Sequence, residues 1–237
     1  MVQWNYQEIE IANPSFEGDY QNQGGQWVAD GWQRWHHEGL PPQEHSQGPC
    51  VPPEYKRLLA SEHPYRVTDG TASQCWHVVW HVFDAGLRQY VELPSPRPDF
   101  LQFEIDGQAW SSEGDDPRRS EGELYGALGI DPFGRGVDAD ELGVLWSPWW
   151  PLGAQFQRIS GPVVQVHADI VTLFIRAWPK WSNFKHNDVI VDHATLHGIY
   201  LLDEGDGPIE PGPAPVDYDE IEQRMARQLA RLRLGLE

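Results

Sequence analysis

Residues 170–178 (IVTLFIRAW) carry the clearest strand pattern in the chain. Side chains of a β-strand point alternately to its two faces, and here one face is formed by Val171, Leu173 and Ile175. The pattern predicts a strand in the middle of a sheet. Pro179 cannot donate to a strand ladder, so it should end this strand and open a loop that presents Trp178 and Trp181. A second strand is expected at residues 189–196 (VIVDHATL).

Gly- and Pro-rich turns separate further strand-like segments on both sides of this stretch. They lie at residues 9–12, 71–83, 86–93, 100–110, 124–130, 144–150 and 155–160. Residues 21–39 and 41–53 are rich in Gly, Gln and Pro, which favours a long ordered loop over sheet. Short strands with frequent turns and no convincing helix predict an antiparallel β-sandwich of jelly-roll type over residues 1–202.

Composition narrows the classes of partner. The 237 residues include 12 Trp and carry a formal net charge of −19, so nucleic acid and anionic membranes are not expected partners. No apolar run has the length of a membrane span, and the first residues lack the pattern of a signal peptide. Either the protein is not secreted by that route or a leader was removed. Cys50 and Cys75 could form a disulfide or remain buried thiols.

The composition changes after Leu202. Residues 203–216 are acidic and rich in Pro and Gly, which predicts an extended linker. Residues 217–237 are predicted to form an amphipathic helix, whose apolar stripe consists of Tyr218, Ile221, Met225, Leu229, Leu232 and Leu236. A lone helix of this length is marginal in water, so it should dock on its own domain or on another copy of the chain.

Several motifs in order resemble the carbohydrate-binding-module-like, galactose-binding-like jelly rolls found as displayed domains in bacterial surface and phage proteins. They are NPSFE (13–17), DGTASQ (69–74), DAGLRQYVEL (84–93), FEIDGQAWSS (103–112), LGIDPFG (128–134), VLWSP (144–148) and residues 171–196. The resemblance implies a structural calcium ion bound by Glu17 and Asp192, because a hard cation prefers carboxylate and carbonyl oxygens. This chain departs from the family where His193 follows Asp192 in place of a second acid.

Proteins bind sugars with aromatic faces that stack on the pyranose ring, aided by amides and carboxylates. The Trp residues beside Gly or Pro or in polar runs are therefore the candidate ligand-binding residues: Trp32, Trp35, Trp149, Trp150, Trp178 and Trp181. Packing in the core or an interface is the competing interpretation for each. Trp76, Trp80 and Trp110 lie within predicted strands and are expected in the core.

A glycoside hydrolase needs two carboxylates around the scissile bond. Glu104 and Asp106 would share one face of a strand, but Gln108 stands where the next acid on that face would be. The His residues follow no metal-ligand spacing.

The sequence thus predicts a non-catalytic module, extracellular or on a virion, that binds a glycan or a protein surface through exposed aromatics. A capsid decoration or tail protein that binds no sugar is the alternative. Calcium is the expected cofactor, and the C-terminal helix the expected means of self-association or docking.

Overall fold

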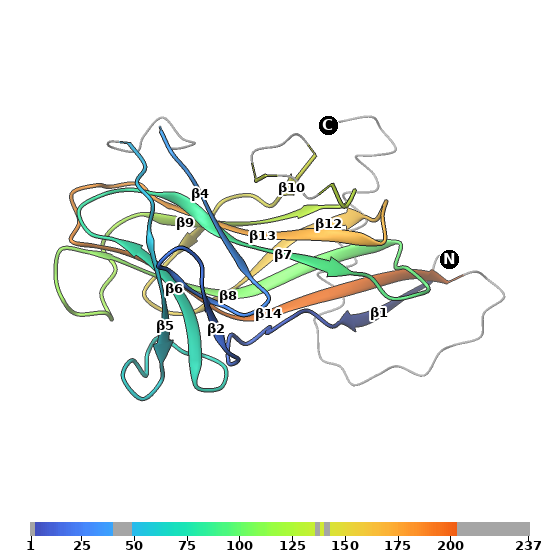
Figure 1. Cartoon of the computed structure of the whole chain (residues 1–237), viewed down its shortest axis with the longest axis horizontal. Helices are drawn as coiled ribbons and strands as arrows, with labels where there is room; N and C mark the ends of the chain where they lie inside the picture. The colour runs from blue at the N-terminus through green and yellow to red at the C-terminus, as the bar shows by residue number, and fades with distance from the viewer. Residues whose placement is uncertain (1–2, 40–48, 136–137, 140–142, 203–237) are drawn as a thin grey trace.

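The computed structural model describes residues 3–39, 49–135, 138–139 and 143–202, and within them the chain is all-β. Two antiparallel sheets pack face to face, and Figure 1 shows them as two layers. The antiparallel β-sandwich predicted from the sequence is confirmed.

The sheet built around β8 contains β12 (Gln157–Gln165), β8 (Phe100–Ser112), β14 (His186–Leu202), β6 (Ala72–Val78) and β5 (Glu54–Leu59) in this order, with β1 (Gln3–Ile9) paired to β14. The sheet built around β13 contains β10 (Leu145–Trp146), β9 (Leu124–Asp131), β13 (Ile170–Pro179), β7 (Asp84–Glu92) and β4 (Gln33–His37), with β11 (Trp150–Leu152) paired to β9. A separate hairpin joins β2 (Tyr20–Asn22) and β3 (Trp27–Ala29). These are called the β8 sheet and the β13 sheet below.

Strand β13 lies between β7 and β9, as its sequence pattern predicted. Leu173 and Ile175 on its inner face join the core, where Phe103 and Ile105 of β8 meet them from the opposite sheet. Burial of these apolar faces between the layers is the main force that holds a sandwich together. The alternate residues of β13 point away from the core and form the middle of an outer face.

The Gln- and Gly-rich segment 21–39 contains β2, β3 and β4, so its prediction as a loop is wrong. Gly24 and Gly25 both have positive φ and form the turn between β2 and β3, a conformation that Gly adopts without steric cost. Side-chain amides complete the pairing, since Gln23 Nε2 donates to the Trp32 carbonyl at 2.7 Å. Strand β5 was also absent from the predicted elements.

The predicted strand 71–83 is interrupted at Val78, where β6 ends. Trp80 adopts φ of +59° in the bend that follows and is 50% exposed, so its predicted place in the core is wrong. Trp76 and Trp110 are buried as predicted.

Cys50 and Cys75 are buried free thiols, and no disulfide joins them. The predicted linker 203–216 and helix 217–237 lie outside the described residues. Within the described part of the chain, no helix is long and apolar enough to cross a membrane.

Candidate functional site

The outer face of the β13 sheet has an arginine at its centre. One row of this face runs from Trp35 on β4 through Gly86 and Arg176 to Ala127 on β9, as the strand registers place them. Gly86 and Ala127 leave the space on both sides of Arg176 free of long side chains. Aromatic residues from more distant positions can therefore reach its guanidinium.

Three indoles surround this guanidinium. The carbon Cζ of Arg176 lies 5.8 Å from the ring centroid of Trp35, 5.4 Å from that of Trp146 and 5.6 Å from that of Trp149. All three indoles are half-buried, and the Arg176 side chain is 12% exposed. Cation–π contacts of this kind hold a cation and aromatic faces in a fixed arrangement. These four residues are called the Arg176 platform.

An ion pair with Asp84 of β7 holds Arg176 in place. Arg176 donates to Asp84 through Nε at 2.8 Å and through a terminal nitrogen at 2.5 Å, and His37 Nδ1 lies 2.9 Å from the same carboxylate. Burial raises the pKa of Asp84, but the bonds from His37 and Arg176 outweigh it and hold the pKa below its ordinary value. The carboxylate is therefore charged near neutral pH and orients the guanidinium among the indoles.

A missing side chain on β9 makes room for Trp146. Trp146 pairs with Gly129, and a Cβ atom at Gly129 would lie 2.8 Å from the indole ring. The ring thus lies directly on the strand backbone, with Phe174 of β13 at 5.8 Å. Ala139 and Val144 pack with Phe174 at this end of the platform. Trp146, Arg176 and Asp84 were not among the site residues predicted from the sequence.

Two of the predicted ligand-binding residues are buried, Trp32 inside the sandwich and Trp178 beneath other aromatic rings on the outer face. Trp32 and Trp178 are each 1% exposed, so the prediction that their indoles are accessible is wrong. Trp32 stacks on Phe16 at 5.4 Å inside the sandwich. Trp178 stacks on Tyr125 at 5.2 Å, and the ring of Trp149 covers it edge-on at 6.0 Å. A neighbouring Gly or Pro did not distinguish exposed from covered indoles.

The other four predicted indoles are half-buried. Trp35 and Trp149 come together on the platform, as described above. Trp150 packs against the core on the inner side of β11, and Trp181 lies apart in the loop after β13, with the Lys180 ammonium 4.8 Å from its ring centroid. Ligand binding by these four residues stays a prediction.

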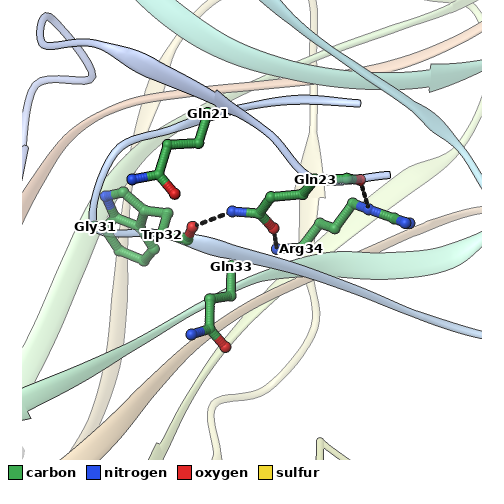
Figure 2. Close-up of a pocket in the computed structure, with 6 residues that line it drawn as sticks. All are labelled: Gln21, Gln23, Gly31, Trp32, Gln33 and Arg34. Atoms are coloured by element: carbon green, nitrogen blue, oxygen red, sulfur yellow. Dashed lines mark hydrogen bonds between the residues drawn. The ribbon is translucent and has the colours of Figure 1, made fainter. Parts of the chain in front are cut away.

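An amide-lined hollow of about 460 Å³ adjoins the edge strand β4 (Figure 2). Gln21, Gln33 and Arg34 line it, together with the backbone of Gly31. Gln33 lies on the same face of β4 as Trp35, and its side chain accepts a bond of 3.3 Å from Arg88. Gln33 therefore belongs both to the lining of the hollow and to the outer face that carries the Arg176 platform.

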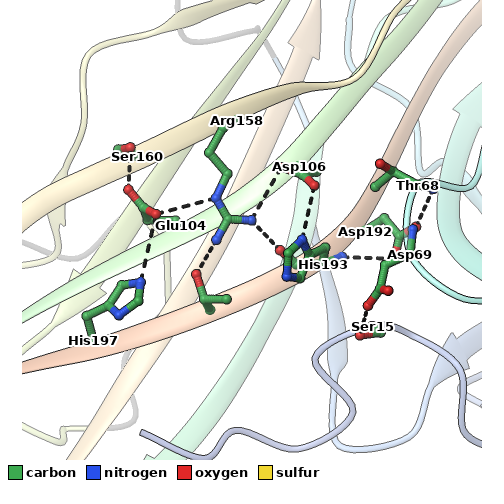
Figure 3. A network of polar contacts seen from close by, with 11 residues as sticks. Ser15, Thr68, Asp69, Glu104, Asp106, Arg158, Ser160, Asp192, His193 and His197 are labelled. Atoms are coloured by element: carbon green, nitrogen blue, oxygen red, sulfur yellow. Dashed lines mark hydrogen bonds and ion pairs between the residues drawn. The ribbon is translucent and has the colours of Figure 1, made fainter. Parts of the chain in front are cut away.

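The carboxylates considered for hydrolysis are engaged by an arginine on the outer face of the β8 sheet (Figure 3). Arg158 lies 3.4 Å from Glu104 and 3.3 Å from Asp106. Ser160 donates to Glu104 at 2.6 Å, and His193 Nδ1 lies 3.3 Å from Asp106. Glu104 and Asp106 do share one face, as the spacing predicted. Both carboxylates therefore already have a cationic partner.

The two predicted calcium ligands both contact the turn at residues 68–72. Glu17 accepts bonds from the peptide nitrogens of Thr71 and Ala72 at 2.5 and 2.7 Å. Asp192 accepts them from Thr68 and Asp69 at 2.8 and 2.9 Å. Both carboxylates therefore contact the same turn, and their role as calcium ligands stays a prediction.

This junction does not fit a cation as it is arranged. Peptide N–H groups face the two carboxylates, whereas calcium requires further oxygen ligands there. Within the described ranges, no three His, Cys, Asp or Glu side chains gather as a metal site would need. Calcium binding stays a prediction that melting experiments can test.

These features define a β-sandwich module with an aromatic, arginine-centred outer face. Neither protein-family models nor the sequences of curated proteins gave a match. Among solved structures, the cyclase Fisc from Fischerella sp. TAU, in complex with (3Z)-3-(1-methyl-2-pyrrolidinylidene)-3H-indole, is similar with a TM-score of 0.52 and 12% identity, over 84% of this chain and 100% of that one.

Two carbohydrate-binding modules are similar at lower scores. TmCBM61, in complex with β-1,4-galactotriose, has a TM-score of 0.49 and 12% identity, over 78% of this chain and 95% of that one. A family 11 module from Clostridium thermocellum, in complex with a β-1,3-1,4-mixed-linked tetrasaccharide, has a TM-score of 0.43 and 10% identity, over 81% and 94%. Carbohydrate-binding modules are therefore among the structural neighbours of this chain, as the sequence resemblance predicted. At these identities the likeness concerns the fold alone.

Proposed function

We propose that this protein is a non-catalytic module that binds a neutral glycan on the outer face of the β13 sheet. The observation that carries the proposal is the Arg176 platform, in which Trp35, Trp146 and Trp149 surround one guanidinium. Half-buried indoles offer apolar ring area that is already ordered, so a sugar that stacks on them orders few side chains.

The polar groups around the platform suit hydroxyl groups. The amides of Gln21 and Gln33 line the adjoining hollow, and amide groups both donate and accept hydrogen bonds. Asp84 already offsets the charge of Arg176, and the chain carries a net charge of −19. Both facts favour neutral over acidic polysaccharides.

Calorimetric titration with a panel of neutral and uronate-containing polysaccharides tests the proposal. Trp149→Ala and Trp35→Ala should each weaken binding of a neutral polysaccharide by at least roughly tenfold, which corresponds to about 1.4 kcal/mol. Tyr65→Ala is the control, because Tyr65 is 60% exposed and its carbonyl contacts Gln108 of the opposite, β8 sheet. Equal loss in all three variants, or binding by none of the panel to the native protein, would contradict the proposal.

The engagement of Glu104 and Asp106 by Arg158 supports a non-catalytic role. Incubation with a bound polysaccharide should release no reducing sugar from either the native protein or Glu104→Gln. Release that this substitution abolishes would show a hydrolase. The extracellular or virion location stays a prediction from the sequence.

A further inference from the structure

An apolar patch covers the outer face of the β8 sheet where β1, β14 and β8 run side by side. Ile199 is buried there, and Trp4, Tyr6 and Phe100 pack against it. The registers pair Trp4 with Leu201, and Ile199 with both Tyr6 and Phe100, so these side chains share one face. Leu201 is 43% exposed next to the end of β14, where it pairs with Trp4. These five residues are called the terminal patch.

Acidic side chains border the terminal patch on one side. Glu8 follows Tyr6 on the same face of β1, where it pairs with His197, and it is exposed. Glu104 lies one row further along the sheet, opposite Thr195, and is already paired with Arg158, so Glu8 is the acid that is open to a partner. A partner that matches this surface would bring an apolar stripe with cations beside it.

The chain itself supplies a segment of this chemistry. Strand β14 ends at Leu202, beside the patch, and Gln3 of β1 pairs with Leu202 there (Figure 1). Residues 217–236 carry an apolar stripe at spacings of three and four. The four acids of this segment, Asp217, Asp219, Glu220 and Glu222, come first, and its four basic residues, Arg224, Arg227, Arg231 and Arg233, follow them.

We propose that residues 217–236 form an amphipathic helix that docks on the terminal patch of the same chain. The linker 203–216 spans at most roughly 50 Å when extended, which is enough to return the segment to a patch that begins at Leu201. The tether also raises the effective concentration of the segment to the millimolar range, which favours its own patch over that of another copy. Docking supplies the apolar contacts without which a single helix of about 20 residues is marginal.

Limited trypsin digestion of the full chain tests this docking, because the four arginines named above are cleavage sites. Leu201→Asp on the patch and Leu229→Asp on the segment should each speed cleavage within residues 217–236 at least tenfold. Leu145→Asp is the matched control, since Leu145 is 45% exposed on β10 of the other sheet, and it should leave cleavage unchanged. Glu8→Lys should also speed cleavage by placing a cation beside the arginines.

Unchanged melting of Leu201→Asp would show that its effect on cleavage is not unfolding. Equal cleavage rates in the native protein and in both patch and segment variants would overturn the proposal. Protection that disappears on dilution, together with sedimentation as a dimer, would also overturn it and assign the segment to the patch of a second copy.

Discussion

Arg176 and Asp84 form a two-point ion pair on the outer face of the β13 sheet, with donor–acceptor distances of 2.8 and 2.5 Å. Asp84 lies on β7, and Arg176 lies on the neighbouring strand β13. The carboxylate side chain is 3% exposed and the arginine side chain 12%. The pair therefore sets the position of a cation that three indoles contact, and its loss should affect folding as well as binding.

Arg176→Met should destabilise the protein by about 3–5 kcal/mol, because it leaves the buried Asp84 carboxylate without its cation. The double variant Arg176→Met with Asp84→Leu should recover part of this loss, since an apolar pair leaves no buried charge unpaired. Chemical denaturation of the three proteins measures both effects. Equal stability of Arg176→Met and the native protein would show that Asp84 is satisfied by His37 alone.

Gly129→Ala should weaken glycan binding with a smaller effect on stability. A Cβ atom at this position would lie 2.8 Å from the ring of Trp146, so the indole must leave its place on β9. The backbone of Gly129 does not have a positive φ, so the new side chain adds no backbone strain. Calorimetric titration and thermal melting together separate the two effects, and an unchanged affinity would exclude Trp146 from the site.

The fold could be predicted where apolar residues alternate. Residues 170–178 were predicted as a central strand, and they form β13, because the two faces of the segment differ in polarity and its length fits a sheet. Strands β2 to β4 were missed because side-chain amides support them, as when Gln74 accepts the peptide N–H of Ala29 at 2.8 Å. The spacing of apolar residues does not indicate such hydrogen bonds.

The site was only partly predictable for a related reason. Trp35 and Trp149 were found from their loop-like surroundings, but the same signal selected the buried Trp32 and Trp178. Burial depends on what the opposite strands and loops place over a ring, which neighbouring residues in sequence do not determine. A usable signal for the centre of the platform was present, since Arg176 interrupts an otherwise apolar strand.

Trp178→Ala should cost about 3–5 kcal/mol of stability, because removal of a fully buried indole leaves a cavity between Tyr125 and Trp149. Trp181→Ala should cost far less, since Trp181 is half-buried in a loop beside Lys180. Denaturation curves of the two variants measure the difference. Similar losses for both would mean that Trp181 packs more tightly than its exposure indicates.

Calcium should change the melting temperature little, because peptide N–H groups already occupy the carboxylates of Glu17 and Asp192. Glu17→Gln should destabilise the protein even in chelator, by about 1 kcal/mol, since a neutral amide oxygen is a weaker acceptor than a carboxylate for the N–H groups of Thr71 and Ala72. Scanning calorimetry with calcium and with chelator tests both statements. A large rise in melting temperature with calcium, lost in Glu17→Gln, would establish the metal site that the sequence resemblance implied.

The stability of the protein should fall with rising pH between about 4 and 6 through Asp192. Burial raises the pKa of this carboxyl from 3.8 to about 6, against three peptide N–H bonds that lower it. The folded state therefore binds more protons than the unfolded state in this window. The contribution of Asp192 to stability is greatest below pH 4 and is lost as the pH rises through its pKa in the folded state.

Asp192→Asn isolates this contribution, because the amide does not titrate and its oxygen can still accept bonds from Thr68 and Asp69. The free energy of unfolding of the native protein relative to Asp192→Asn should drop by about 1–3 kcal/mol from pH 4 to pH 7, given about 1.36 kcal/mol for each unit of pKa shift. The lowered pKa values of Asp84 and Glu17 act in the opposite direction at lower pH and cancel in this comparison. Denaturation at four pH values measures the difference. A constant difference would show that the three N–H bonds hold Asp192 ionised throughout.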